Sequence, residues 1–255
     1  MMKKTTCLLA AIILLALPAK ALALGFEVAV GVWSQSPSGD IGYEIDSSSD
    51  LVDLKRDAGF DRESRFLGRA KLELPIIPNI YLQATPMEFS GKGDKSVNFQ
   101  FGDQTFDADV DFKSKLTLDQ YDVALYYGVP LTGLATLGTV NIDLGLNLRF
   151  VSLKAEIDQP DTGFKESKSA TLTVPMLYAG VQISPVDRFG LDLEGRYITY
   201  SGNRYLDLVA RLKAKITGPV FAAAGWRYQD IKIDARDIEG SLKVSGPFLE
   251  TGFTF

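Results

Sequence analysis

The residues that could do chemistry in this 255-residue chain are carboxylates, because the sequence contains no histidine. Asp192 and Glu194 stand two positions apart, so an extended strand would point both side chains to the same side. Paired carboxylates can act as general acid and base. The alternative is that both form ion pairs with Arg196, Arg211 or Arg227, and we favour this pairing over a catalytic role.

A second group of carboxylates occurs at Asp107, Asp109 and Asp111, which also alternate along an extended segment. Several oxygen ligands of this kind suit Ca²⁺, but the spacing is not that of an EF-hand loop. We therefore expect a solvated acidic hairpin here, with these three residues as weak candidates for a cation site. The sequence otherwise predicts no metal and no cofactor.

The first 23 residues have the organisation of a secretory signal peptide. Lys3 and Lys4 precede an apolar run over 7–17, and an A-x-A cleavage site ends at Ala21 or Ala23. We predict removal of 1–23 and a single mature domain over 24–255. Cys7 is the only cysteine, so the mature chain would contain neither a disulfide nor a thiolate metal site.

Loss of the signal peptide would change the charge balance of the chain. It removes three lysines, so that 24 of the 27 basic residues remain against 32 acidic ones, a net charge of -8. A chain this acidic is a poor nucleic-acid binder. We therefore expect no nucleic-acid partner.

Apolar and polar residues alternate with a period of two along most of the mature chain, and no helical periodicity competes with this pattern. Residues 116–129 show it most clearly, and residues 140–150 place six apolar side chains on one side. Such alternation predicts half-buried β-strands. We predict ten of them, at residues 26–35, 65–74, 80–90, 116–129, 140–150, 170–184, 189–200, 205–216, 220–232 and 246–255.

The connections between these strands differ in length and polarity. One or two helical turns are expected at 50–56 and a hairpin between 97–101 and 105–112. Long loops outside and short turns inside are typical of outer-membrane barrels, and an even strand number would place both termini in the periplasm. The long polar connections are predicted at 36–64, 91–114, 158–169 and 234–239, and the short ones at 75–79, 130–138, 185–188 and 218–219.

The polar side of the strands decides between a soluble and a membrane barrel, because period two alone fits both. Eight acidic residues share that side with eight basic ones and with several glycines, which weaken strands and would have little use on a water-facing exterior. We therefore predict an all-β fold, a transmembrane antiparallel up-and-down β-barrel whose lumen is filled by paired charges. The predicted lumenal charge network comprises Arg69, Lys71, Glu73, Asp143, Arg149, Asp192, Glu194, Arg196, Arg211 and Arg227, and the same side of the strands also carries Glu27, Asp122, Asp207, Glu250, Lys213 and Lys215.

Two further features fit a membrane barrel. The last strand ends on an aromatic row, with Phe253 and Phe255 on the same side, as in closing strands that carry a C-terminal assembly signal. Pro75, Pro78 and Asn79 form a tight stop between two strands, since each proline fixes its φ angle and lacks an N–H for the sheet. We predict that this turn is periplasmic.

The segment Glu73-Leu-Pro-Ile-Ile-Pro-Asn-Ile80 is the most specific of several motifs by which the chain resembles a family of small proteobacterial outer-membrane β-barrel proteins without assigned activity. Members of the family tend to have histidine where this chain has Leu74. That departure removes a metal or proton role for the position. Shorter matches follow in order at Gly31-Val-Trp33, Phe99-Gln-Phe-Gly102, Thr105-Phe-Asp107, Tyr121-Asp-Val-Ala-Leu-Tyr-Tyr127, Asp143-Leu-Gly145, Val174-Pro-Met-Leu-Tyr178, Gly225-Trp-Arg-Tyr228 and Gly246-Pro-Phe248.

These observations predict a monomeric, non-enzymatic protein of the bacterial outer membrane with a structural or surface-interaction role. Outer-membrane lipids and lipopolysaccharide would surround it, and the barrel-assembly machinery would insert it. One alternative is a narrow channel for small solutes or ions. A second is a barrel enzyme that works without histidine, for which Asp192 and Glu194 are the candidates.

Overall fold

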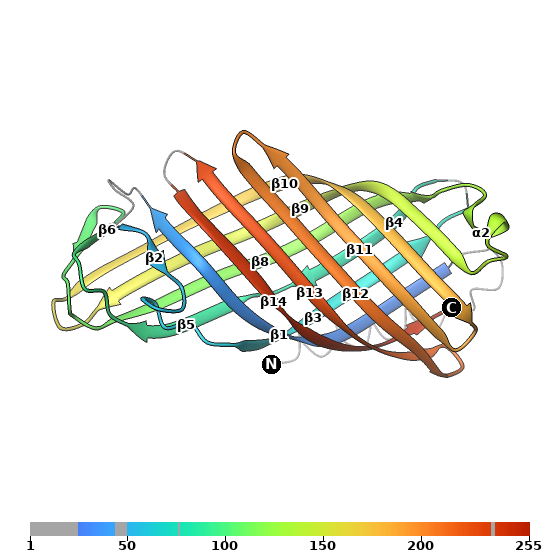
Figure 1. Cartoon of the computed structure of the whole chain (residues 1–255), viewed down its shortest axis with the longest axis horizontal. Coiled ribbons are helices and arrows are strands. Elements are labelled where there is room, and N and C mark those ends of the chain that lie inside the picture. The colour runs from blue at the N-terminus through green and yellow to red at the C-terminus, as the bar shows by residue number, and fades with distance from the viewer. Residues whose placement is uncertain (1–24, 44–49, 76, 236–237) are drawn as a thin grey trace, which may run out of the picture.

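Ten antiparallel strands close into a barrel in the computed structural model, which describes residues 25–43, 50–75, 77–235 and 238–255 (Figure 1). Closure occurs where β1 (Gly25–Tyr43) pairs with β3 (Glu63–Glu73) on one edge and with β14 (Ile238–Thr254) on the other. The remaining wall strands are β4 (Asn79–Thr85) with β5 (Glu88–Gly93), β8 (Phe112–Gly128), β9 (Val140–Gln159), β10 (Phe164–Val186), β11 (Phe189–Tyr200), β12 (Asn203–Thr217) and β13 (Val220–Ala235).

Each wall strand pairs with its sequence neighbours in an up-and-down order, so the predicted fold and number of strands are confirmed for the described residues. β4 and β5 count as one wall strand, since both pair with β8 and only Pro86 and Met87 separate them. In the part of the chain that the structure describes, no helix is long and apolar enough to cross a membrane. The predicted signal peptide lies outside the described residues.

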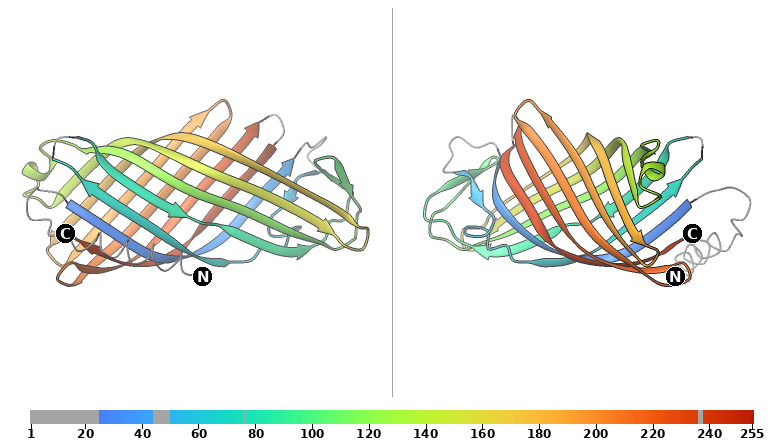
Figure 2. Two further views of the ribbon diagram at one scale, coloured as in Figure 1. Left: turned by 180° about the vertical axis from the view of Figure 1, so that it is seen from behind. Right: turned by 45° about the vertical axis from the view of Figure 1, so that its right-hand side comes forward.

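β1 begins and β14 ends at the same end of the barrel, here called the terminal end (Figure 2). The N–H of Phe26 donates to the carbonyl of Phe255 over 3.2 Å, which fixes the start of β1 beside the last residue. The connections after β3, β8, β10 and β12 also lie there, and the one after β8 includes the short helix α2 (Thr132–Ala135). The opposite end is called the distal end.

The predicted loop at 158–169 is wrong. Its residues continue β9 and β10 as a long hairpin whose turn comprises only residues 160–163. β1 likewise runs to Tyr43, and β14 already begins at Ile238. The distal end therefore has two long connections, after β1 and after β5, and otherwise tight turns between extended strands. The error arises because the extensions carry polar side chains on the outside and apolar ones on the inside, which is the reverse of the rest of each strand.

β9 shows this reversal within one strand. Between Val140 and Phe150 its leucines point outward and its Asp, Asn and Arg side chains point into the lumen. From Val151 onward the apolar side chains point into the lumen, while Lys154 and Glu156 point outward. We call the part of the barrel with a polar lumen, represented by β9 residues 140–150, the terminal half, and the part represented by residues 151–159 the distal half.

The distal half encloses the hydrophobic core. The segment between β1 and β3, which includes β2 (Val52–Asp53), and the hairpin of β6 (Phe99–Phe101) and β7 (Gln104–Phe106) fill it from inside. This hairpin confirms the one predicted at 97–112, with shorter strands. The helical turns predicted at 50–56 are only partly correct, because Val52 and Asp53 form strand β2 and a single turn follows at 54–57. In this turn the Asp53 carboxylate accepts hydrogen bonds from the N–H groups of Lys55 and Arg56.

Candidate functional site

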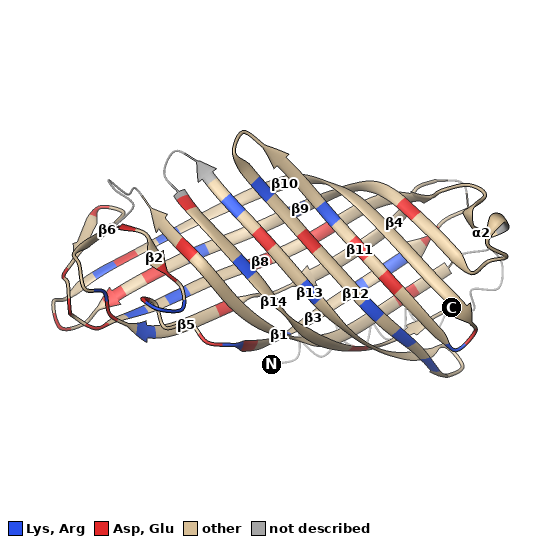
Figure 3. Cartoon of the chain, in the orientation of Figure 1, with Lys and Arg blue, Asp and Glu red and all other residues tan. Residues whose placement is uncertain are grey.

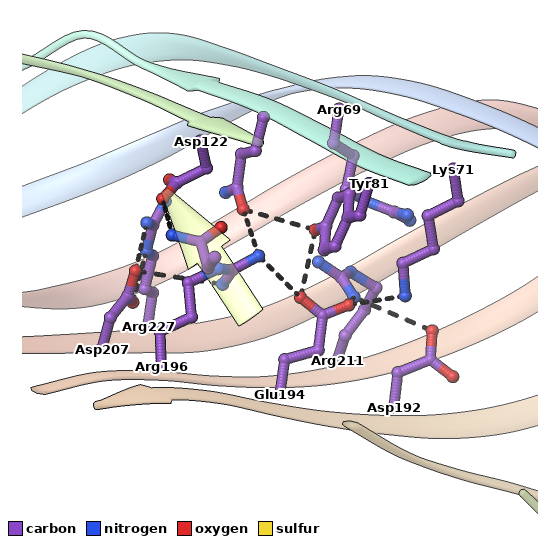
Figure 4. A network of polar contacts seen from close by, with 12 residues as sticks. Arg69, Lys71, Tyr81, Asp122, Asp192, Glu194, Arg196, Asp207, Arg211 and Arg227 are labelled. Carbon is purple, nitrogen blue, oxygen red and sulfur yellow. Dashed lines mark hydrogen bonds and ion pairs between the residues drawn. The ribbon is translucent and has the colours of Figure 1, made fainter. Parts of the chain in front are cut away.

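The candidate site is the charge network that fills the lumen of the terminal half (Figure 4). Strand alternation positions it, because every second residue of a barrel strand points inward. Charged residues occur on nearly every wall strand (Figure 3), and the inward ones of the terminal half meet near the barrel axis. The buried members are Arg69, Lys71, Asp122, Asp143, Arg149, Asp192, Glu194, Arg196, Asp207, Arg211, Arg227 and Glu250.

Asp207 is the centre of the part of the network nearest the distal half. Its fully buried carboxylate accepts hydrogen bonds from Arg149 Nη2 over 2.5 Å and from Arg227 Nε and Nη2 over 2.9 and 2.6 Å. Arg149 also holds Asp122 in a bidentate pair, with distances of 2.8 and 2.9 Å. Such charge-assisted bonds lock planar guanidinium groups in one orientation.

Glu194 and Glu250 form a second centre nearer the terminal end. Glu194 accepts from Lys71 Nζ over 2.8 Å, from Arg211 Nη1 over 3.1 Å and from the Tyr81 hydroxyl over 3.0 Å. Glu250 bridges Arg211 Nε and Arg69 Nε over 2.9 and 3.1 Å. Five strands, β3, β4, β11, β12 and β14, are thereby tied together across the lumen.

Arg196 connects the two centres. Its guanidinium lies 5.0 Å from the ring centroid of Tyr81 and 5.4 Å from that of Tyr178, in cation–π contact with both. Its Nη2 is 3.7 Å from Glu194, and its Nη1 is 4.0 Å from Asp207. The charges therefore form one network that crosses the lumen from wall to wall.

The pairing predicted for Asp192 and Glu194 is confirmed. Asp192 lies 3.8 Å from both Arg211 and Lys213, and Glu194 binds Lys71 and Arg211 directly. Both carboxylates are buried among cations that they neutralise. Ion pairing accounts for their side-by-side position.

Three predicted lumenal charges do not join the ion pairs. Glu73 and Lys215 are exposed at the terminal end and form no ion pair with another described residue. Asp143 is buried as expected, but its hydrogen-bond partner is the amide of Gln182, at 3.4 Å, rather than a cation. Period two places all three on the lumenal side of their strands, but it says nothing of their height along the barrel.

Uncharged residues complete the network and were not predicted as members. Gln83 accepts a hydrogen bond from Arg196 over 3.1 Å, and the Thr85 hydroxyl accepts one from Arg227 over 2.8 Å. Gln120 and Gln229 exchange amide hydrogen bonds across the lumen over 2.9 and 3.1 Å. Their inward position on predicted strands was a usable signal, since buried polar groups need partners.

Three aromatic residues separate the charges from the apolar core of the distal half. Trp33, Tyr205 and Phe248 belong to that core, yet their rings face the guanidinium groups of Arg227, Arg149 and Arg211 at 5.0, 4.7 and 5.6 Å. The Trp33 indole N–H also donates to the carbonyl of Gly246 over 3.1 Å. One side of these three rings thus binds a guanidinium group through a cation–π contact, and the other side packs against the apolar core.

The outer surface of the terminal half is an apolar band between aromatic residues. On β8, Val123 and Leu125 point outward between Tyr121 and Tyr127, as the sequence predicts. Phe66, Phe150 and Trp226 are exposed on the distal side of this band. Phe189, Phe253 and Phe255 are exposed on its terminal side. An apolar band with aromatic borders is the exterior of a barrel that spans a bilayer.

The proline turn and the acidic hairpin differ in how far the structure explains them. The N–H of Leu74 donates to Asn79 Oδ1 over 2.8 Å, which closes the turn that Pro75 and Pro78 delimit. Among the described residues, by contrast, no three acidic side chains gather around a point where a metal ion would fit. The predicted cation candidates, Asp107, Asp109 and Asp111, are thus not brought together.

The segment that fills the distal half carries its own ion pair. Arg56 Nε lies 2.8 Å from Asp57, whose other oxygen accepts the N–H of Asp53 over 3.0 Å. Burial alone would raise the pKa of Asp57, but these hydrogen bonds outweigh it and lower the pKa below its usual value. Lys95 donates to the carbonyl of Leu51, and its burial lowers its pKa.

Comparisons with known proteins add little beyond this geometry. No protein-family model matches the sequence, and no curated protein matches it. Among solved structures, the attachment invasion locus protein Ail of Yersinia pestis is similar over 91% of this chain and 99% of its own, with 11% identity and a TM-score of 0.41. The translocator domain of the autotransporter NalP from Neisseria meningitidis is similar over 99% and 98%, with 13% identity and a TM-score of 0.41. At this similarity neither protein lends its role to this chain, so the fold assignment rests on the strand pairing itself.

Proposed function

We propose that this chain is an integral protein of the bacterial outer membrane with a closed lumen and a rigid extramembrane head formed by the distal half. The observation that carries the proposal is the reversal of polarity within single strands. Apolar side chains cover the outside up to Phe150 of β9, whereas charged ones cover it from Lys154 onward. The apolar exterior of the terminal half is stable in the hydrocarbon of a bilayer, and the charged exterior of the distal half is stable in water.

The lumen has the character of a plug. Its cross-section in the terminal half is filled by guanidinium and carboxylate groups that are fully buried and bound to one another, including Arg149, Arg196 and Asp207. The apolar core lies directly above them. A non-enzymatic, structural or surface-interaction role follows, because the carboxylates that chemistry would need are already neutralised.

The expected surroundings follow from the same surfaces. Outer-membrane lipids cover the apolar band, and lipopolysaccharide meets the charged exterior of the distal half. The termini and the Pro75–Asn79 turn would face the periplasm, and Phe253 and Phe255 would serve the barrel-assembly machinery as the C-terminal signal. We propose a monomer, since one chain closes its own sheet.

Two measurements test this function. Purified protein in planar bilayers should show no steady conductance steps; regular ion-selective steps would favour the narrow-channel alternative. Topology can be read from single cysteines, since the mature chain would have none. Thr162→Cys in the β9–β10 turn should react with a membrane-impermeant maleimide on intact cells, whereas Asp187→Cys at the terminal end should react only after the outer membrane is broken. The opposite labelling would contradict the proposal.

A further inference from the structure

The distal half has one strand whose second edge is unpaired. β10 pairs with β9 from Phe164 to Ile183, but with β11 only from Leu177 to Val186. β11 and β12 turn back at Tyr200 and Asn203, so β10 continues past them toward the distal end (Figure 1). Residues 164–176 of β10 therefore have no paired strand on the β11 side.

The register shows which backbone groups face that open side. The N–H of Ser184 donates to the carbonyl of Thr139 over 2.7 Å, on the β9 side, and the β9–β10 register continues without a shift. In an antiparallel sheet the N–H and C=O of alternate residues point to opposite neighbours. Even-numbered residues of β10 thus bond to β9, and odd-numbered ones point away from it. On that open side, the N–H of Ser167 donates to Glu166 Oε1 over 3.2 Å, whereas the N–H groups of Lys165, Ser169, Thr171 and Thr173 have no described partner.

The position of the open edge agrees with the proposed membrane boundary. In the register of β8, β9 and β10, Tyr121 lies opposite Phe150, and Phe150 lies opposite Thr173. Tyr121 and Phe150 mark the distal border of the apolar band, and the unpaired edge of β10 ends at the same level, at Thr173. Within the apolar band every backbone group must be paired, whereas above it water can satisfy an open edge. Pro175, which has no N–H to donate, is odd-numbered and stands at the change from free to paired edge.

The open edge of β10 differs from the matching edge of β5, which the chain covers itself. A Cβ atom at Gly91 would lie 2.2 Å from the carbonyl oxygen of Ala58, and one at Gly93 would lie 1.8 Å from that of Asp57. The segment at 57–59 thus lies directly on β5. Apart from the bond between the Ser167 N–H and the adjacent Glu166 side chain, no hydrogen bond between described residues involves the open side of β10 at 165–173.

The side chains along the open edge indicate what would fit beside it. Outward, it presents Ser169, Thr171 and Thr173, all exposed and uncharged. On the lumenal side, Val174 packs against the apolar core and Leu172 is 40% exposed next to it, while Ala170, Lys168 and Glu166 follow toward the distal end. A strand added here would need apolar residues next to Leu172 and Val174 and polar residues on the outer side.

We infer that the edge at 165–173 is a docking site for an extended peptide segment of another protein, with alternating apolar and polar residues, which adds as a further strand. Main-chain hydrogen bonds would give affinity, and Leu172 with Val174 would select the apolar positions. The inference deepens the proposed function, on which it rests for the location of the edge outside the cell.

A peptide with the sequence of residues 151–159 tests the inference. It is the segment that β10 already accepts on its other edge, and Val151, Leu153, Ala155 and Ile157 alternate in it with polar residues. A fluorescein-labelled copy should bind the protein in detergent micelles, measured by anisotropy. A peptide of the same composition without alternation should not bind.

Two matched variants then separate the backbone from the side chains. The double variant Ser169→Pro and Thr171→Pro removes two free N–H groups and no bond to β9, and should raise the Kd of the peptide at least about tenfold. Ser169→Ala with Thr171→Val keeps both N–H groups and should leave the Kd within about twofold. The shift in SDS-gel migration between unheated and heated samples checks that both variants fold.

Hydrogen exchange on the unchanged chain gives a readout that needs no variant. Bound peptide should slow exchange of the amides of Lys165, Ser169, Thr171 and Thr173 and leave their even-numbered neighbours as they were. Absence of peptide binding, unchanged exchange, or equal binding by the proline variant would each overturn the inference. Conductance steps or reversed cysteine labelling would instead contradict the proposed function, because binding in micelles depends on neither.

Discussion

The terminal and distal halves of the barrel use the same strands with opposite polarity. In the terminal half Arg149 and Asp207 are inside and Leu146 is outside. In the distal half Leu153 and Ile157 are inside and Lys154 is outside. Alternate residues point inward along the whole strand in both halves, so the difference lies in whether the outward side chains are apolar or polar. The residue at which the outward side chains change from apolar to polar therefore marks the edge of the membrane.

The two interiors are also held together by different forces. The terminal half depends on charge-assisted hydrogen bonds, which are strong only while every partner is present. The distal half depends on the burial of apolar surface, such as the stacked rings of Phe99 and Phe106, whose centroids are 5.2 Å apart. Loss of a side chain should leave an uncompensated charge in the first case and a cavity in the second.

The largest effect is expected for Asp207→Ala. The change leaves Arg149 and Arg227 buried without their shared carboxylate and should lower the free energy of unfolding by about 3 to 5 kcal/mol. Asp158→Ala is the matched control, because Asp158 meets Lys165 over 3.4 Å on the exposed exterior, and its loss should cost less than about 1 kcal/mol. Urea unfolding in detergent micelles measures both. Similar losses would show that burial does not distinguish the two ion pairs.

Phe106→Ala should cost about 3 kcal/mol, because it opens a cavity in the apolar core of the distal half. The β6–β7 hairpin belongs to a segment enclosed by the barrel, so near-ultraviolet circular dichroism should lose signal before the strands unfold. Phe66→Ala removes a ring of the same size that is 78% exposed at the border of the apolar band, and its effect should be much smaller. An equal effect of the two changes would contradict an apolar core inside the distal half.

Leu146→Lys places a charge in the middle of the apolar band, where it should cost about 2 to 3 kcal/mol in a lipid bilayer. Ser152→Lys makes a comparable change on the same face of the same strand, six residues further on, where the exterior is polar. We expect it to be nearly neutral. Reversible unfolding in phospholipid vesicles measures the pair, and a neutral Leu146→Lys would move the membrane boundary.

The sequence predicts the terminal half almost completely, because there the apolar side of each strand is long and its polar side carries charge. The sequence prediction fails in the distal half, where it places a loop at residues 158–169. Inward and outward side chains continue to alternate there, with Ile157 and Phe164 on the lumenal side, but the outward side chains are polar. A search that accepts strands with polar outward and apolar inward side chains, as well as the reverse, would extend β9 and β10 correctly.

The charge network shows a similar division. Residue type and parity place Arg69, Arg149 and Glu194 in the lumen, as the structure confirms. They also place Glu73 there, although it is exposed at the terminal end. Strand tilt and stagger set the height of each residue in a barrel, and these follow from the closed register of all strands. No single strand contains that information.

The smallest effect is expected from Asp57→Asn in the segment that fills the distal half. The pKa of Asp57 is lowered in the folded protein, so its stabilising contribution is present above its unfolded pKa and is lost as pH falls through the folded value. At pH 6 the variant should unfold at a temperature lower by no more than about 2 °C, and the difference should shrink as the pH falls below the unfolded pKa of about 3.9. Circular dichroism melting in micelles measures both values. A difference that grows toward acid would mean that the Arg56 ion pair opposes folding, and that burial alone holds this segment in place.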